Sequence, residues 1–341
     1  MDTLTDYLTP MWLNDVLRSR GYLRRGYVES LQIVQMMHTP PSQLVQFSVA
    51  YSPDTVSTAP SNFFLKIPRP AMLETAQREA HFYNTIAPLL PKNLLLPWYC
   101  VDVTIAQTPA LLLGDVSTTH MVWHDQISSL PVLESMSATL AQLHAWAWER
   151  TDIEEYIGES SQMTLASMFV QAQARYQELV DSLGDTLNTE QRLILEAYIR
   201  HAPKLFQTRL QQKNGLTLCH PDNHPENFLL PRFDQHEVYL IDWQVYRWWW
   251  GGVDLAALLT RSVCSALQPQ RYALLRRYHT ALQMAGVTNY PWEACWYDYQ
   301  LGVIDTVRVV LSMRQRPQSA LRVLLGLVQE WHSCRCWELC S

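Results

Sequence analysis

The chain has no long uninterrupted apolar segment and no excess of basic residues. Nowhere do 18 apolar residues follow one another, although 48% of the 341 residues are hydrophobic, so we expect no membrane span. The net charge of −6 disfavours nucleic acid as a partner, because phosphate backbones are bound by basic surfaces. The first residues, Met1 to Asp6, lack the charge pattern of a signal peptide. We expect a cytoplasmic protein, monomer or homodimer, without membrane or nucleic-acid partners.

A disulfide framework is also disfavoured, because the seven cysteines are odd in number and irregularly spaced, as in a reducing compartment. Cys334, Cys336 and Cys340 lie near His332 in the tail and could bind zinc, but the lack of a second cluster favours packed or exposed thiols. The other four lie in apolar stretches and are expected to be buried: Cys100, Cys219, Cys264 and Cys295.

The strongest functional signal is the octapeptide from His220 to Asn227, which reads HPDNHPEN. Asp222 stands two residues after His220 and five before Asn227, and Asp242 follows further along the chain. A phosphoryl-transfer loop needs one carboxylate for the attacking hydroxyl, plus an amide oxygen and a second carboxylate for magnesium on the nucleotide. The spacing of these residues supplies all three groups.

Apolar runs on both sides of this loop predict strands. Residues 216–219 precede the loop, and residues 228–230 and 238–241 follow it. The last two runs would pair as a hairpin, which would bring Asn227 and Asp242 together near its open end.

Two other interpretations of the loop stay open. Asp222 could be an ordinary turn residue, or His220, Asp222 and His224 could form a zinc site. The irregular backbone that Pro221 and Pro225 impose counts against zinc.

A lysine within an apolar strand is the second signal. Lys66 is the only charged residue in the predicted strand 62–67, and lysine is depleted in strand interiors. Burial without a partner would be costly, so we expect Glu79, in the predicted helix 71–86, to pair with it. The alternative is an edge-strand lysine whose ammonium reaches water.

Together these motifs resemble those of aminoglycoside phosphotransferases and choline kinase-like enzymes, and most closely the ecdysteroid kinase-like branch. The resemblance covers about residues 8 to 260. It rests on Lys66, Glu79–Tyr83, Leu140–Ala145, the octapeptide, Ile241–Gln244 and Asp254–Ala256.

The resemblance implies an α+β, two-lobed protein-kinase-like fold. The N-lobe, residues 1–113, would hold an antiparallel sheet with one helix, and the C-lobe, residues 114–341, would be mostly helical. The implied activity is Mg²⁺-dependent transfer of the γ-phosphoryl group of ATP or GTP to a hydroxyl of a small organic molecule. By the same resemblance, Asp222 is the catalytic base, Asn227 and Asp242 bind Mg²⁺, Lys66 holds the phosphates, and Glu79 orients Lys66.

The resemblance also gives His220 and Asp254 bracing roles, and we expect His144 to be a packed, hydrogen-bonded histidine. Two segments depart from the family pattern. The stretch that should cover the phosphates, residues 36–47, contains no glycine, so hydroxyls of Thr39 and Ser42 are the expected substitutes for close backbone N–H groups. The second segment is the junction of the lobes, where Gly114, Asp115 and Val116 stand in place of the acidic pair that is usual in the family. Leu113 and Asp115 at this junction are also expected at the nucleotide site.

The acceptor site is expected between the loop and helices of the C-lobe, where aromatic residues gather. Rings and carboxylates could bind a cation, broad ring surfaces could hold a steroid-like alcohol, or the rings could be core. Two rival functions stay open: a kinase-like binding module without turnover, favoured by the missing glycines, and a zinc hydrolase. The candidate acceptor contacts are His224, Gln244, Trp296 and Asp298.

Hydrophobic periodicity predicts the remaining elements. We expect a helix at 15–20 capped by Asn14, strands at 28–34, 43–51, 99–105 and 110–113, and helices at 130–149, 165–183, 189–206, 253–267, 270–284, 291–313 and 319–331.

Overall fold

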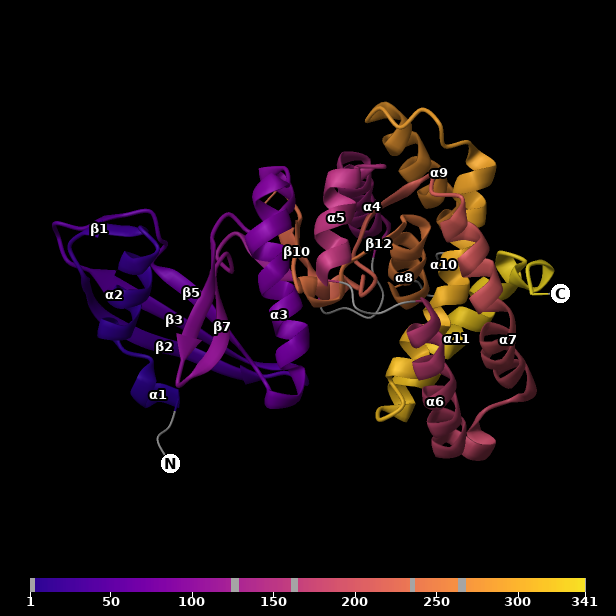
Figure 1. Ribbon diagram of the computed structural model, residues 1–341, viewed down its shortest axis with the longest axis horizontal. Coiled ribbons are helices and arrows are strands. Elements are labelled where there is room, and N and C mark those ends of the chain that lie inside the picture. The colour runs from indigo at the N-terminus through magenta and orange to yellow at the C-terminus, as the bar shows by residue number, and fades with distance from the viewer. Residues whose placement is uncertain (1–3, 124–128, 161–164, 234–236, 263–267, 341) are drawn as a thin grey trace. The chain divides into compact units, whose positions relative to one another are not determined.

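The computed structural model describes residues 4–123, 129–160, 165–233, 237–262 and 268–340. The chain forms two compact units, and Figure 1 labels most of their helices and the longer strands. Unit 1 comprises Met1–Met121 and Leu229–Gln244, and unit 2 comprises Val122–Phe228 and Val245–Ser341. A single boundary after residue 113 remains a prediction. The α+β class is as predicted, because unit 1 is built on antiparallel sheets and unit 2 mostly on helices.

Unit 1 is built on a five-stranded antiparallel sheet with strand order β2-β3-β5-β7-β6. Alternation decides which face of β5 is buried: Phe63 and Leu65 are fully buried in the core of the unit, whereas Lys66 points the other way. The strands are β2 (Val28–His38), β3 (Ser42–Tyr51), β5 (Asn62–Pro68), β6 (Tyr99–Ile105) and β7 (Thr108–Gly114).

Shorter elements complete unit 1. β1 (Leu23–Arg25) pairs with β4 (Val56–Ser57), and β10 (Phe228–Pro231) lies between β11 (Tyr239–Leu240) and β8 (His120–Val122). The predicted hairpin after the octapeptide is therefore present as the β10–β11 pair.

Two helix predictions in unit 1 need correction. After α1 (Leu4–Tyr7), α2 runs from Pro10 to Ser19 and is capped by Thr9, whose hydroxyl accepts from the Trp12 amide at 3.1 Å. Asn14 is not a cap; its side-chain oxygen accepts from the Val28 amide at 2.9 Å and so ties α2 to β2. The helix expected at 71–86 is α3 (Leu73–His81) between a 3₁₀ turn and a π-helical turn.

Unit 2 is mostly helical and includes one two-stranded ribbon, β9 (Leu216–Cys219) against β12 (Arg247–Trp250). The predicted helices are present with small shifts at their ends, and residues 263–267 and Cys264 lie outside the described part of the chain. The helices are α4 (Leu130–Ala147), α5 (Thr151–Ser160), α6 (Leu165–Leu183), α7 (Thr189–Gln211), α8 (Gly252–Ser262), α9 (Gln268–Met284), α10 (Trp292–Ser312) and α11 (Pro317–Ser333).

Glycines bring α8 and α10 close together in unit 2. A Cβ atom on Gly252 would lie 2.4 Å from the backbone carbon of Asp298, and one on Gly302 would lie 2.4 Å from the Gly252 carbonyl oxygen. Only glycine permits this approach. The crossing places the inner face of α8 directly against α10. No helix among the described residues is both long and apolar enough to cross a membrane.

Candidate active site

Unit 1 contains a buried cluster of one ammonium and two carboxylates. The Nζ of Lys66 donates to Glu79 Oε2 at 2.7 Å and also to Asp242 Oδ1. The side chains of Lys66 and Glu79 are only 14% and 4% exposed. Burial alone would lower the pKa of Lys66, but Glu79 and Asp242 outweigh it and raise that pKa. The lysine is therefore fixed as a cation. Lys66 of β5 and Glu79 of α3 form the pair that the sequence predicted.

Asp242 is held in an uncommon backbone conformation. Its φ of 68° is in the left-handed region, which is unusual for a residue other than glycine. Its Oδ1 accepts from Gln244 Nε2 at 2.7 Å. The next residue, Trp243, is fully buried and stacks on Phe82 with ring centroids 4.1 Å apart. This stacking fixes the chain on one side of Asp242 and so fixes its carboxylate beside Lys66.

A cavity of about 380 Å³ in unit 1 adjoins this cluster, a volume within the range of small-ligand sites. Lys66, Glu79, Ser42 and Gln244 all line it, together with Pro109, Ala110 and Leu111 of β7. Among the described residues, neither Leu113 nor Asp115 belongs to this lining.

The hydroxyls that were expected to replace a glycine-rich loop bond to their own hairpin. Thr39 Oγ1 lies 3.1 Å from Ser42 Oγ and 2.9 Å from the Ser42 carbonyl oxygen. The Ser42 side chain is 2% exposed. Asp115 is also engaged, because its carboxylate accepts from Gln46 at 2.8 Å and from the Ser117 amide at 2.7 Å. These contacts stabilise the turns of unit 1.

In unit 2, β9 leads directly into the octapeptide, which is held at both ends. The His220 amide donates to Asp254 Oδ2 at 2.5 Å. At the other end, Asn227 Nδ2 donates to the Asp222 carbonyl oxygen at 2.9 Å. This bond uses the amide nitrogen of Asn227 and leaves the amide oxygen for a ligand.

The side chain of Asp222 is 38% exposed and forms an ion pair. Arg261 Nη1 lies 2.8 Å from its Oδ1, and His224 Nε2 lies 3.8 Å from its Oδ2. Burial acts to raise the pKa of Asp222, but Arg261 and His224 outweigh it, so the pKa is lowered. His224 itself is kept neutral, because burial and then Arg261 lower its pKa to about 4. Asp222 is therefore an ionised carboxylate at neutral pH.

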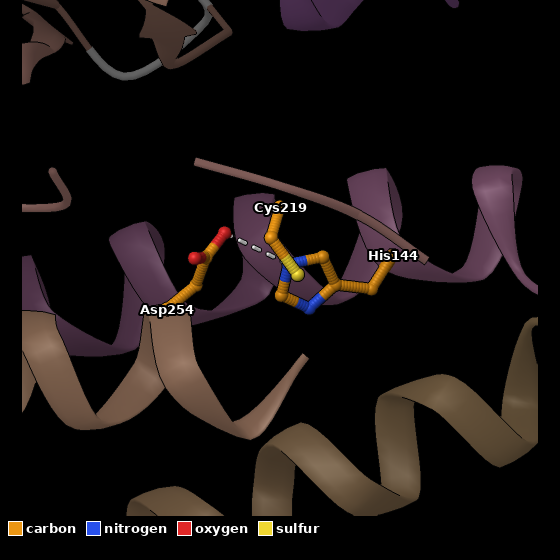
Figure 2. Close-up of side chains that lie close together, drawn as sticks. All are labelled: His144, Cys219 and Asp254. Carbon is orange, nitrogen blue, oxygen red and sulfur yellow. Dashed lines mark hydrogen bonds and ion pairs between the residues drawn. The ribbon is translucent and has the colours of Figure 1, made fainter. Parts of the chain in front are cut away.

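Behind the loop, His144, Cys219 and Asp254 lie together in the interior of unit 2 (Figure 2). Their potential ligand atoms are all within 4.8 Å of one another, and all three residues are buried. His144 Nε2 lies 3.2 Å from Asp254 Oδ2, while its Nδ1 lies 2.6 Å from the hydroxyl of Tyr278. Burial raises the pKa of Cys219 well above its usual value. A neutral thiol and a histidine bonded through both nitrogens fit a hydrogen-bonded brace for the loop rather than a metal site.

The family model that describes a phosphotransferase enzyme family matches residues 44–292 of this chain. The chain belongs to this phosphotransferase family. The match covers more than half of the chain and includes both the Lys66 cluster and the octapeptide. The ecdysteroid kinase-like branch remains a prediction.

Solved structures of low sequence identity share the fold of this phosphotransferase. A putative aminoglycoside phosphotransferase from Ralstonia eutropha has a TM-score of 0.60 at 10% identity, covering 95% of this chain and 98% of that one. A choline kinase from Cryptosporidium parvum has a TM-score of 0.59 at 13% identity, covering 91% of both chains. An ethanolamine kinase from Plasmodium vivax has a TM-score of 0.54 at 11% identity, covering 88% and 81%. The predicted two-lobed kinase-like fold is confirmed, and no curated protein matches the sequence.

Two of the four candidate acceptor contacts pack against helices of unit 2, away from the octapeptide in sequence. Asp298 is 1% exposed and bonds Arg209 Nε at 2.5 Å and the Tyr290 hydroxyl at 2.9 Å, which gives it a structural role. Trp296 packs among Tyr272, Trp292 and Tyr299. Of the other two, His224 adjoins Asp222, and Gln244 belongs to the cavity of unit 1.

The zinc interpretations find no support among the described residues, where His144, Cys219 and Asp254 are the only group of three closely placed potential ligands. His220, Asp222 and His224 do not form such a group, and neither do the tail cysteines. The thiol of Cys334 donates instead to Glu330, and His332 pairs with Glu190.

Sequence reasoning missed Arg261, the ion-pair partner of Asp222. One signal could have pointed to it: Arg261 is the only charged residue between Leu255 and Ser262 on an otherwise apolar helix. A cation at that position needs a partner, as Lys66 does.

Proposed function

We propose that this phosphotransferase moves the γ-phosphoryl group of ATP or GTP to a hydroxyl of a small organic molecule, with Mg²⁺ bound at Asp242 and Asn227. The observation that carries the proposal is the cluster of Lys66, Glu79 and Asp242. The lysine and Asp242 are 176 residues apart in sequence, yet their side chains bond to each other, and Lys66 lines a cavity of ligand size. A buried lysine paired with a helix glutamate is the arrangement by which kinases hold nucleotide phosphates.

The donor set fits a magnesium ion. Asp242 offers carboxylate oxygens and Asn227 an amide oxygen, and Mg²⁺ prefers hard oxygen ligands. When bound, the ion would neutralise charge on the nucleotide phosphates. Lys66 would then exchange part of its contact with Asp242 for a phosphate oxygen, while Glu79 keeps its ammonium in place.

Asp222 would accept the proton of the acceptor hydroxyl. The hydroxyl oxygen forms a bond to the γ-phosphorus, the bond from that phosphorus to the bridging oxygen breaks, and the nucleoside diphosphate leaves with the electron pair. The partial exposure of Asp222 in unit 2 leaves it accessible to an acceptor. The brace through Asp254 and His144 would keep the loop rigid during transfer.

The test compares two substitutions by calorimetry and turnover. Asp222→Ala should lose more than 95% of nucleotide turnover yet bind Mg·ATP within about twofold of the wild type, because it removes the base and no nucleotide contact. Asp242→Asn should weaken Mg·ATP binding at least about tenfold while binding of metal-free ATP changes less. Retained turnover in Asp222→Ala, or unchanged Mg·ATP affinity in Asp242→Asn, would contradict the assignment.

A kinase-like binding module without turnover is the second candidate. The internal hydrogen bonds of Thr39 and Ser42 favour it, because they leave the hairpin without glycine or free hydroxyls for the phosphates. Wild-type protein that binds Mg·ATP but releases no ADP over hours, with or without hydroxyl compounds, would support this second function.

A further inference from the structure

Arginines from four elements of unit 2 have Asp222, Asp305 or another arginine of this group as an electrostatic neighbour. Arg261 of α8 bonds Asp222, and Arg308 of α10 bonds the buried Asp305 at 3.1 Å. Arg247 of β12 reaches the same carboxylate at 2.6 Å. A fourth, Arg175 of α6, donates to the neutral side chain of Gln171 at 3.2 Å.

Arg308 lies within electrostatic range of Asp222, of Arg247 and of Arg175, and Arg261 pairs with Asp222 directly. The carboxylate of Asp222 contributes to the raised pKa of Arg308, after the larger effects of burial, which lowers it, and of Asp305. Burial lowers the pKa of Arg175, and the neighbouring Arg314 and Arg308 lower it further, against a smaller opposite effect of Glu178. With Arg314 and its partner Glu178 included, five guanidinium groups lie near three carboxylates, Asp222, Asp305 and Glu178, which leaves two positive charges in excess.

Hydrogen-bond donors are also in surplus at this cluster. Arg247 Nε is buried and has no hydrogen-bond partner among the described residues, and neither has the hydroxyl of Tyr198, whose side chain is fully buried near the same arginines. Arg261 uses Nη1 for Asp222, and a guanidinium has five N–H donors. An additional acceptor group would satisfy donors that the protein leaves over.

The cluster is accessible in part. The side chains of Arg261, Arg308 and Arg247 are 12%, 23% and 15% exposed, beside Asp222 at 38%. A partly desolvated guanidinium binds carboxylate and phosphate groups more strongly than an exposed one, because screening by water is weaker there.

The aromatic rings of unit 2 are less suited to a cationic ligand than the sequence suggested. The guanidinium of Arg276 lies 3.5 Å from the ring centroid of Trp292, and that of Arg247 lies 4.4 Å from the centroid of Trp249. Arg150 covers Trp146 in the same way at 4.5 Å. The protein's own cations already occupy these ring faces.

We propose that the arginines beside Asp222, namely Arg175, Arg247, Arg261 and Arg308, form a site for an anionic group of the phosphate acceptor. The acceptor is then a hydroxyl compound with a carboxylate or similar anion, unlike choline or ethanolamine, which are cations. This substrate class rests on the proposed kinase function, but the anion site does not. Arg261 would bridge Asp222 and the anion of the acceptor, which would bring the hydroxyl near the base.

The experiment uses three probes with one scaffold and different charge: 4-hydroxyphenylacetate (anion), tyrosol (neutral) and tyramine (cation). Calorimetric titrations are made with the full chain, saturated with Mg²⁺ and a non-hydrolysable ATP analogue. A second set, glycerate, glycerol and serinol, repeats the comparison on an aliphatic scaffold. We expect the anion of at least one set to bind about tenfold more tightly than its neutral and cationic counterparts, and to lose this advantage at high salt.

Variants test whether these arginines cause the preference. Arg261→Gln and Arg308→Gln should each reduce the ratio of anion to neutral affinity at least about fivefold, whereas Arg261→Lys should keep most of it. The ratio is measured within one protein, so a general loss of stability does not imitate the effect. When Arg308 is replaced, Asp305 still has Arg247 as its ion-pair partner. Arg322→Gln, at an exposed position of α11, is the matched control and should leave the ratio unchanged.

Three results would overturn the inference: equal or tighter binding of the cations, no binding of either anion at millimolar concentration, or an anion preference that survives Arg261→Gln and Arg308→Gln. Failure of the proposed function is a separate result, because these titrations require no turnover. An anion preference without phosphoryl transfer would leave the site in place and remove the kinase. Turnover without an anion preference would support the kinase and remove the anion site.

Discussion

Replacement of Lys66 by methionine tests the electrostatics of unit 1. Methionine keeps the length and apolar character of the side chain but removes the ammonium that Glu79 and Asp242 share. The two carboxylates are then left with repulsion in place of a common partner, and Glu79 is 4% exposed. Removal of one partner from a buried ion pair costs about 3–5 kcal/mol. Since Asp242 is 23% exposed, we expect Lys66→Met to lower the free energy of unfolding of unit 1 by about 2–4 kcal/mol at pH 7.5.

The sign of the pH dependence follows from the charge that is removed. Protonation of a carboxylate relieves the repulsion. The difference in free energy of unfolding between the wild type and Lys66→Met should therefore shrink as the pH falls from 7.5 to 5. The two units can unfold separately, so the free energy is read from hydrogen exchange of the β5 and α3 amides in unit 1. Lys92→Met is the control, because Lys92 is exposed and should change the free energy by less than about 0.5 kcal/mol. A deficit below that value for Lys66→Met, or one independent of pH, would refute the ion-pair account.

Three further predictions concern unit 2. Asp254→Asn should destabilise unit 2 by about 2–4 kcal/mol in urea denaturation, because the carboxylate accepts from the His220 amide and from His144, and hydrogen bonds to charged groups contribute about 1.5–3 kcal/mol each. Asp152→Asn, at an exposed position, is the control, and equal stability of the two variants would disprove the brace. Asn223→Leu should stabilise unit 2 by about 1–3 kcal/mol in the same assay, because both polar atoms of this fully buried side chain lack hydrogen-bond partners among the described residues. A loss of stability would mean that these atoms are satisfied. Between pH 6.5 and 4 the free energy of unfolding of the wild type should fall by up to about 3 kcal/mol more than that of His224→Gln. The reason is that the unfolded chain binds a proton at His224, whereas the folded chain, with a pKa of about 4 at this residue, does not. Parallel curves of stability against pH would contradict the buried neutral histidine.

Short-range patterns in the sequence predicted most elements of both units. The apolar run at 62–67 identified β5, and helical periodicity gave α6 its observed bounds. The pairing of Lys66 with Glu79 could be expected because a buried cation needs a partner. These inferences need only local periodicity and charge.

Contacts between distant residues could not be predicted in the same way. Arg261 reaches Asp222 across 39 residues, and Arg209 reaches Asp298 across 89; nothing in the sequence near either aspartate reveals its arginine. The helix cap was also assigned wrongly, because Thr9 and Asn14 are both residue types that cap helices well. Thr9 caps α2, and the side chain of Asn14 instead accepts from the Val28 amide, a tertiary contact that the local sequence does not reveal. The expected cytoplasmic location and oligomeric state remain predictions.

The most direct test of the phosphoryl-transfer account is ³¹P NMR of Mg·ATP incubated with the wild-type protein and with Asp222→Asn. The proposed chemistry predicts slow, enzyme-dependent loss of the γ-phosphate signal to water, accelerated by a hydroxyl acceptor and absent in Asp222→Asn. Wild-type protein that leaves Mg·ATP unchanged both with and without hydroxyl compounds, or Asp222→Asn that consumes it at the wild-type rate, would contradict the account.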